Sequence, residues 1–113
     1  MESRQRGQSN QQIARAISWI RQNLAEEMRV GDLAEHANMS LTTFRERFRS
    51  VAGLSPVHFQ KMLRLQEARQ LMLDQNMSAG RASALVGYES ASQFNREYRR
   101  LFGAPPQTDG SSL

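Results

Sequence analysis

Cysteine is absent from the 113 residues of the chain, which excludes disulfides and thiolate metal sites and is compatible with a reducing cytoplasm. The apolar runs are only a few residues long, so the sequence predicts no membrane span, for which about 20 apolar residues are needed. No hydrophobic region follows the charges at the start of the chain, and we therefore expect no signal peptide there.

Histidine is scarce as well. The two that occur, His36 and His58, have neither a carboxylate nor a second histidine at the spacing of a metal site. No glycine-rich phosphate loop is present, and no sequence pattern holds a serine, histidine and aspartate together as a catalytic set. The sequence therefore predicts a protein that is not an enzyme and that has no metal site and no cofactor.

Lysine is nearly missing too, since Lys61 is the only lysine among 15 basic residues and the others are arginine. The net charge is +4, and residues 40–53 and residues 90–103 each contribute two of these charges. Arginine favours bidentate recognition of phosphate or guanine over plain charge attraction, although a GC-rich genome would produce the same bias. The excess charge thus lies in two segments that are candidates for nucleic-acid contact.

These two basic segments are copies of one another, 50 positions apart. Residues 40–56 align without a gap on residues 90–106. The identical pairs are Ser40/Ser90, Phe44/Phe94, Arg49/Arg99, Gly53/Gly103 and Pro56/Pro106. Upstream, the same interval pairs Ala34 with Ala84, and we expect both alanines where two helices cross closely. A duplicated basic helix, capped by serine and ended by glycine, predicts one reading element used twice.

Helical periodicity runs through the chain, and no segment alternates with the period of two that is typical of a strand. The sequence therefore predicts an all-α fold, with helices at residues 10–24, 31–37, 40–53, 56–73, 80–86 and 90–102. We group them into a first helix-turn-helix subdomain (10–54), a long linker helix (55–75) and a second helix-turn-helix subdomain (76–106). A disordered N-terminal segment (1–9) and a tail (107–113) are expected at the ends.

Each copy is predicted to be a helix with an apolar inner face and a polar outer face. We expect the inner faces to consist of Phe44, Phe48 and Val51, and of Phe94, Tyr98 and Leu101. The outward residues are then of types that read base edges or hold phosphates. They are Thr42, Arg45, Glu46 and Arg49 in the first copy, and Ser92, Gln93, Arg96, Arg99 and Arg100 in the second.

Other interpretations of the repeat stay open at this point. Basic amphipathic helices often form plain solvated surfaces, and two-helix repeats also build protein-binding solenoids, although a solenoid normally needs three or more units. A protein-interaction adaptor would bind protein and ignore duplex DNA, whereas a DNA reader loses affinity steeply with salt. RNA binding is less well supported, because the outward faces carry no aromatic residue on which bases could stack.

The segment from Ile13 to Pro106 resembles the DNA-binding domain of the AraC/XylS family of bacterial transcription regulators. The motifs that carry the resemblance are residues 64–73, residues 86–90, Gln93-Phe94, Arg96, Tyr98-Arg99, Phe102-Gly103 and Pro106. The resemblance implies about seven helices, with two helix-turn-helix subdomains joined by the long helix around Leu63. It also implies a cytoplasmic protein that binds double-stranded DNA, with two recognition helices in major-groove segments ~34 Å apart.

Carried over position by position, the base-contacting residues of the family fall on both predicted recognition helices. The resemblance assigns base reading to Thr42, Arg45 and Glu46, and to Ala91, Ser92, Gln93 and Arg96. Phosphate contacts are expected from the capping serines, since a helix N-terminus attracts anions, and from the remaining outward arginines. These phosphate-binding residues are Ser40, Arg49, Ser90, Arg99 and Arg100.

Glu46 departs from the family pattern, because many members carry a basic or neutral residue there. Its carboxylate would repel phosphates, but it can accept from cytosine N4 or brace Arg45 and Arg49. The three-residue spacing to Arg49 favours bracing. The tail at residues 107–109 departs as well, which predicts a weaker final helix.

The resemblance has further implications for partners. Family members contact RNA polymerase, so an adaptor that contacts RNA polymerase is the alternative function. We expect the chain to be the DNA-binding half of a larger effector-responsive regulator, monomeric in isolation. A minority of the family consists of the DNA-binding part alone, and that possibility stays open.

Overall fold

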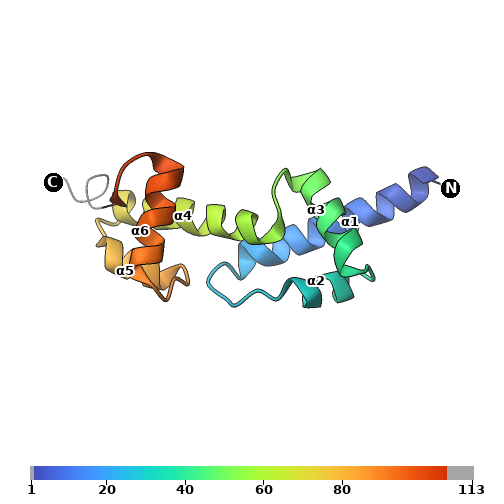
Figure 1. Ribbon diagram of the computed structural model, residues 1–113, viewed down its shortest axis with the longest axis horizontal. Coiled ribbons are helices and arrows are strands. Elements are labelled where there is room, and N and C mark those ends of the chain that lie inside the picture. The colour runs from blue at the N-terminus through green and yellow to red at the C-terminus, as the bar shows by residue number, and fades with distance from the viewer. Residues whose placement is uncertain (1, 107–113) are drawn as a thin grey trace. The chain divides into compact units, whose positions relative to one another are not determined.

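The computed structural model describes the backbone of residues 2–106, with side chains from Gln8 onward. Within this range the chain contains six helices and no strand (Figure 1). They are α1 (Glu2–Gln22), α2 (Val30–His36), α3 (Leu41–Ala52), α4 (Pro56–Asp74), α5 (Ala79–Leu85) and α6 (Ala91–Phe102). The prediction of an all-α fold is confirmed. A seventh helix after Pro106, and the predicted tail at 107–113, lie outside the described residues.

The helices form two compact units. The first unit contains α1, α2, α3 and the start of α4, up to Gln60. The second contains the rest of α4, from Lys61, together with α5, α6 and the short segment Leu24–Glu26 that follows α1. The predicted linker helix therefore corresponds to α4, but its residues belong to one unit or the other.

Aromatic and aliphatic side chains of α1, α3 and the start of α4 fill the core of the first unit, where α3 packs against α1 and α2. Ile13 and Ile20 of α1 are fully buried, as are Phe44 and Phe48 of α3. The Phe48 ring meets the Phe59 ring of α4 nearly edge-on, with 5.6 Å between centroids. Burial of each such side chain contributes about 1.5–3 kcal/mol, so this core determines which face of α3 points outward.

The core of the second unit is built around a series of aromatic rings. The rings of Tyr88 and Phe94 lie 5.3 Å apart, those of Phe94 and Tyr98 lie 5.6 Å apart, and those of Tyr98 and Phe102 lie 4.5 Å apart. Phe94 and Tyr98 are buried on the inner face of α6. The aliphatic and small buried residues around these rings are Leu65, Ala68, Met72, Ala82 and Val86.

The first helix is longer at its N-terminus than the sequence analysis predicts. α1 begins at Glu2, not near Asn10, so the prediction of a disordered segment over residues 1–9 is wrong from Glu2 onward. The helix also ends at Gln22, two residues before the predicted end at Leu24. Residues 2–9 include glutamate, arginine and glutamine and no proline, so a helix nucleated at the buried Ile13 can propagate outward through them.

Two residues predicted to face the core are exposed. Val51 is 46% exposed and Leu101 is 45% exposed, so this part of the predicted inner faces is wrong. The inner face follows a four-residue spacing from Phe44 to Phe48, which continues to Ala52, and each residue turns the helix by about 100°. In the second copy the spacing continues to Phe102, which packs against the core instead.

Candidate nucleic-acid interface

The first candidate reading helix, α3, is delimited by local hydrogen bonds. Asn38, in the turn after α2, takes a left-handed φ of 56°, which asparagine tolerates better than most residues. Ser40 caps α3, because its Oγ accepts from the Thr43 N–H at 3.2 Å. The helix ends at Gly53, whose φ of 82° is left-handed. The predicted cap and stop of this helix are confirmed.

The second candidate reading helix, α6, has the same ends. The Oγ of Ser90 accepts from the Gln93 N–H at 3.2 Å, the same distance as at the first cap. Gly103 ends the helix with a φ of 81°. The capping serine and the terminal glycine of each copy therefore do the same structural work, as the repeat predicts.

The turns before these two helices differ in length by one residue. In the first turn the Met39 N–H donates to the Ala34 carbonyl at 3.0 Å. The matching bond in the second turn runs from the Tyr88 N–H to the Ser83 carbonyl, also at 3.0 Å. Ala34 and Ser83 are buried, whereas Ala84 is exposed. The prediction that Ala84 lies at a close helix crossing is wrong, because Glu89 adds one residue between the second turn and the cap of α6.

The outward residues of α3 lie where the sequence analysis places them. Thr42, Arg45, Glu46 and Arg49 are all exposed. Within the described part of the chain, however, no ion pair joins Glu46 to either arginine. The prediction that Glu46 braces Arg49 is therefore wrong here, since an exposed pair gains little in water and loses side-chain entropy. All four side chains remain hydrated and open to a ligand.

The outward face of α6 is also exposed, with one exception. Arg96 and Arg99 flank a small hollow of about 170 Å³ against Pro105. Gln93 is half-buried, because its side chain turns toward the helix that carries it. The exposed residues of the predicted site on this helix are Ala91, Ser92, Arg96, Arg99 and Arg100.

A polar network that the sequence does not predict surrounds Glu97 of α6. Its carboxylate accepts from Tyr88 Oη at 2.6 Å, from Gln93 Nε2 at 2.9 Å and from Lys61 Nζ at 3.0 Å. Burial alone would raise the pKa of Glu97, but these hydrogen bonds and the Lys61 charge outweigh it and hold the pKa below its ordinary value of 4.5. Glu97 is therefore ionised at neutral pH and is an acceptor only.

The donors of this network give little signal in the sequence. Burial and the hydrogen bond to Glu97 raise the pKa of the Tyr88 phenol, so this group stays a donor. Lys61 lies 36 positions before Glu97 and forms an ion pair with it, with 3.0 Å between Nζ and Oε2. No local spacing rule connects residues so far apart. The one signal in the sequence is that Lys61 is the only lysine in an arginine-rich chain.

Arg64 of α4 holds the backbone of two other segments in the second unit. Its guanidinium donates to the Leu24 carbonyl at 2.8 Å, to the Glu26 carbonyl at 3.0 Å and to the Gly87 carbonyl at 3.4 Å. Burial lowers the pKa of Arg64, and the neighbouring Tyr88 and Glu97 partly offset this effect. Arginine remains a cation even so, and Arg64 satisfies carbonyls that no helix pairs.

Gly87 occupies a position in the second turn where a side chain does not fit. Its φ is 102°, in the left-handed region that favours glycine. A Cβ placed on it would lie 2.8 Å from the Ala25 carbonyl oxygen and 2.9 Å from the Arg64 guanidinium. The turn before α6 is therefore packed directly against the Leu24–Glu26 segment.

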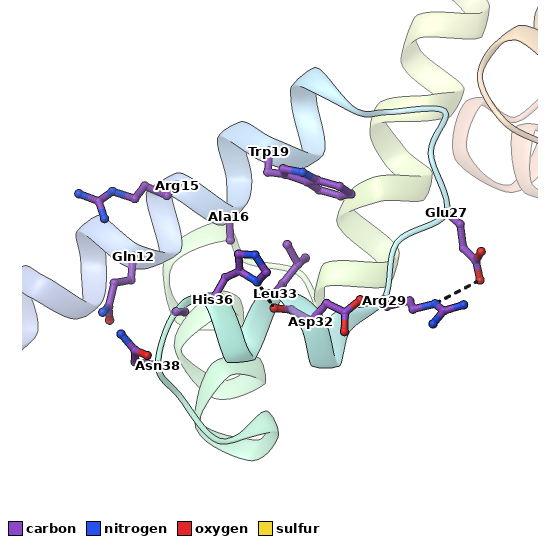
Figure 2. A pocket seen from close by; sticks show the side chains of 11 residues that line it. Gln12, Arg15, Ala16, Trp19, Glu27, Arg29, Asp32, Leu33, His36 and Asn38 are labelled. Atoms are coloured by element: carbon purple, nitrogen blue, oxygen red, sulfur yellow. Dashed lines mark hydrogen bonds and ion pairs between the residues drawn. The ribbon is translucent and has the colours of Figure 1, made fainter.

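A groove of about 610 Å³ lies between α1 and α2 in the first unit (Figure 2). Trp19 of α1 and Leu33 of α2 provide large apolar side chains to its lining, and Trp19 is 36% exposed. His36 points toward the same space, with its Nδ1 hydrogen-bonded to the Asp32 carbonyl at 2.9 Å. None of the residues predicted to contact bases or phosphates lines this groove.

Neither histidine belongs to a cluster of ligating side chains. His58 Nδ1 is hydrogen-bonded to Ser55 Oγ at 2.8 Å, at the start of α4. Among residues 2–106, no three histidine, aspartate or glutamate side chains gather closely enough to hold a metal ion. In the same range no helix has both the length and the hydropathy needed to span a lipid bilayer.

Comparison with protein families and curated proteins places these features in context. A family model described as a helix-turn-helix domain matches residues 33–109, which include both capped helices. The helix-turn-helix-type transcriptional regulator ExsA of Pseudomonas aeruginosa is 35% identical over 98 residues, which cover 87% of this chain and 35% of ExsA. The chain spans about a third of the length of the curated relatives it matches.

Solved structures share the fold. The DNA-binding domain of AdpA, a global transcriptional factor, was crystallised in complex with a target DNA. It matches with a TM-score of 0.82 and 28% identity, over 88% of this chain and 90% of that one. A transcriptional regulator from Chromobacterium violaceum, described as AraC-type DNA-binding domain-containing, matches with a TM-score of 0.81 and 25% identity, over 92% and 93% of the two chains.

Proposed function

The chain belongs to the AraC/XylS family of bacterial transcription regulators, and from this membership we propose that it binds double-stranded DNA sequence-specifically through α3 and α6. Each helix enters a major groove with its exposed face against the base edges. The observation that supports the proposal most strongly is that α3 and α6 are built in the same way. A serine-capped helix keeps aromatic side chains inside and arginines outside, and a left-handed glycine stops it.

Base reading on α3 is assigned to Thr42, Arg45 and Glu46. Arg45 is exposed and can donate to guanine O6 and N7 as a bidentate pair. Glu46 has no ion pair in the free protein, so its carboxylate can accept from cytosine N4 instead of bracing a neighbour. A base edge without a donor would leave the Glu46 carboxylate unpaired close to the phosphates that repel it. Glu46 therefore disfavours every base except one that donates to it.

Base reading on α6 is assigned to Ala91, Ser92, Gln93 and Arg96. Ala91 and Ser92 lie in the first turn and are exposed, so they can contact a thymine methyl group or a base edge. Arg96 is the residue of this set with the reach and geometry for a guanine. Gln93 is half-buried, and its contribution depends on its bond to Glu97.

Phosphate contacts are assigned to Arg49, Arg99 and Arg100, which are exposed in the last turns of their helices. Ser40 and Ser90 are assigned to phosphates at the helix N-termini. Each serine oxygen already accepts a backbone N–H, and Ser90 Oγ is also hydrogen-bonded to Ser92 Oγ at 3.2 Å. The unpaired N–H groups of the first turn, together with the Ser40 hydroxyl hydrogen, are therefore the donors left for a phosphate.

The experiment that tests the proposal is selection of bound sequences from randomised duplexes of about 25 base pairs at near-physiological salt. We expect two short motifs, with the preference at one base pair relaxed in the first motif by Arg45→Ala and in the second motif by Arg96→Ala. Arg15→Ala, an exposed arginine of α1 outside the reading helices, is the matched control and should leave both motifs intact. Failure to enrich any sequence would contradict sequence-specific binding.

The same proposal extends to the cellular setting. We place the domain in the bacterial cytoplasm, as a monomer without catalytic activity that contacts RNA polymerase while bound to DNA. An adaptor that contacts RNA polymerase without DNA is the alternative. Titration of duplex at increasing salt separates the two, because DNA binding weakens by about 0.9 log units per log unit of salt for each phosphate contact, whereas an adaptor shows no duplex binding.

A further inference from the structure

We infer that Glu97 is a positioning residue that fixes the orientation of the Gln93 amide and thereby determines which bases α6 accepts. This inference rests on the proposed function of α6 as a reading helix. Gln93 Nε2 lies 2.9 Å from Glu97 Oε2. An ionised carboxylate has no hydrogen to donate, so only the NH₂ side of the amide can face it. The ionised carboxylate therefore decides which way the Gln93 amide is turned.

The amide oxygen of Gln93 is left free by this arrangement. No described residue donates to Gln93 Oε1, and no buried side-chain polar atom in residues 8–106 lacks a hydrogen-bond partner. Oε1 is therefore open to solvent. Gln93 thus presents an acceptor to a ligand, with its first amide hydrogen already committed to Glu97.

Glu97 is itself held from two other elements. Tyr88 Oη, in the turn before α6, donates to Oε1, and Lys61 Nζ of α4 donates to Oε2. The Glu97 side chain is 16% exposed. Charge-assisted hydrogen bonds of this kind are roughly twice as strong as neutral ones, so the carboxylate cannot easily swing away when DNA approaches. The orientation of Gln93 is therefore set before binding.

A fixed acceptor selects among base edges. In the major groove adenine N6 and cytosine N4 are donors, whereas guanine O6 and thymine O4 are acceptors that would face Gln93 Oε1 unfavourably. A free glutamine could turn its amide to suit either kind of edge. We therefore expect adenine or cytosine at the base that Gln93 contacts.

The first copy lacks this device. The residues that the repeat aligns with Gln93 and Glu97 are Thr43 and Arg47, both exposed on α3. No carboxylate stands at position 47 to orient a neighbour. Restriction of one base by a partly buried carboxylate is therefore a property of α6 and not of α3.

The test is sequence selection with the full chain and four variants. Gln93→Ala identifies the base pair that Gln93 reads, because only that preference is lost. Glu97→Gln replaces the carboxylate with an amide that can face Gln93 either way. We expect the preference at the same base pair to fall about three- to tenfold, with the rest of the motif retained. Lys61→Met and Tyr88→Phe each remove one partner of Glu97 but keep its bond to Gln93, and they should retain the preference.

A second measurement needs no DNA. In the ¹⁵N–¹H NMR spectrum of the free protein, one side-chain amide hydrogen of Gln93 should be shifted downfield by the carboxylate, and the shift should become smaller in Glu97→Gln but persist in Lys61→Met. A Gln93 signal that is the same in wild type and Glu97→Gln would overturn the inference.

The DNA selection separates this inference from the proposed function. A motif that Glu97→Gln leaves unaltered at the base pair identified by Gln93→Ala would overturn the inference while sequence-specific binding stands. Equal loss of the preference in Glu97→Gln and Lys61→Met would reduce Glu97 to a general structural role. Absence of any enriched motif would overturn both proposals.

Discussion

In the first helix-turn-helix unit a left-handed asparagine, Asn38, and an apolar core set the turn before α3, whereas in the second unit a glycine and a partly buried polar network set the turn before α6. Gly87 and Tyr88 replace Asn38 and Met39, and Arg64 binds the turn backbone. The reading helices themselves keep the same cap, stop and inner aromatics. The helix and its ends are therefore the repeated part, whereas the turn before the helix differs between the two units.

The reading faces differ in the placement of their one carboxylate. In α3 the pair Glu46 and Arg47 is exposed, whereas in α6 the aligned pair Arg96 and Glu97 has the order of charges reversed. Glu97 is turned inward onto Lys61, so α6 presents arginines to a ligand and α3 presents arginines with a carboxylate among them. Equal net charge in the two copies therefore does not mean equal reading chemistry.

The largest change in stability is expected from a substitution in the turn before α6. Gly87→Ala should destabilise the protein by about 3 kcal/mol or more, because a left-handed φ and a close backbone approach both penalise the new Cβ. Gly103→Ala meets a left-handed φ but open space, and should cost about 1 kcal/mol. Urea unfolding of both variants measures the difference. Equal losses would mean that the close approach at Gly87 contributes nothing.

The next effect contrasts the aligned positions 46 and 96. Arg96→Ala should weaken binding to the selected duplex by about 1–3 kcal/mol and relax preference at one base pair. Glu46→Gln should instead raise affinity for unrelated duplexes, because it removes a charge that repels phosphates. Fluorescence anisotropy with selected and scrambled duplexes measures both. Equal weakening of Arg96→Ala on every sequence would reassign Arg96 to phosphate.

An acid titration tests the network that only the second unit has. The folded-state pKa of Glu97 lies below 4.5, so its stabilising contribution is present above about pH 4.5 and is lost as the pH falls through the lower folded value. Wild type should therefore lose its stability advantage over Glu97→Gln on acidification, as measured by urea unfolding at a series of pH values. A constant difference between the two proteins would contradict the network.

A smaller effect compares the two aligned phosphate arginines. Arg49→Ala and Arg99→Ala should each weaken binding almost uniformly across sequences and reduce the slope of log affinity against log salt by about 0.9. Comparison of the two variants shows whether both units contact the DNA phosphates equally. An unchanged slope in either variant would remove that arginine from the proposed phosphate contacts.

The smallest effect concerns the exposed ends of the inner faces. Val51→Ser and Leu101→Ser should change the free energy of unfolding by no more than about 0.5 kcal/mol, because both side chains are nearly half exposed. Phe48→Ala, three residues before Val51 but buried, should cost about 3–5 kcal/mol. Thermal unfolding distinguishes these outcomes. A large loss of stability in Val51→Ser would mean that Val51 contributes to the core.

The sequence predicts what local rules determine. Ser40, Ser90, Gly53 and Gly103 were identified correctly because capping and stopping a helix depend on a few neighbouring residues. The outward faces followed from helical periodicity for the same reason. The prediction that Val51 faces the core was wrong because helical periodicity does not indicate where along a helix the core ends.

Features that join distant parts of the chain could not be predicted. The extra residue at Glu89 is invisible in a gap-free alignment, because the copies upstream of it share too little sequence to show the shift. The bonds from Lys61 and Tyr88 to Glu97 depend on packing between segments. The absence of a Glu46–Arg49 pair reflects a balance of solvation and entropy that spacing alone does not contain.

The aromatic residues are divided unequally between the two units. Trp19, the only tryptophan, belongs to the first unit, and both tyrosines, Tyr88 and Tyr98, belong to the second. The two halves of the molecule therefore carry different chromophores without any engineering. Tryptophan emission follows the loss of one half and the tyrosine signal follows the loss of the other, so coincidence of the two transitions measures how cooperatively the duplicated halves unfold.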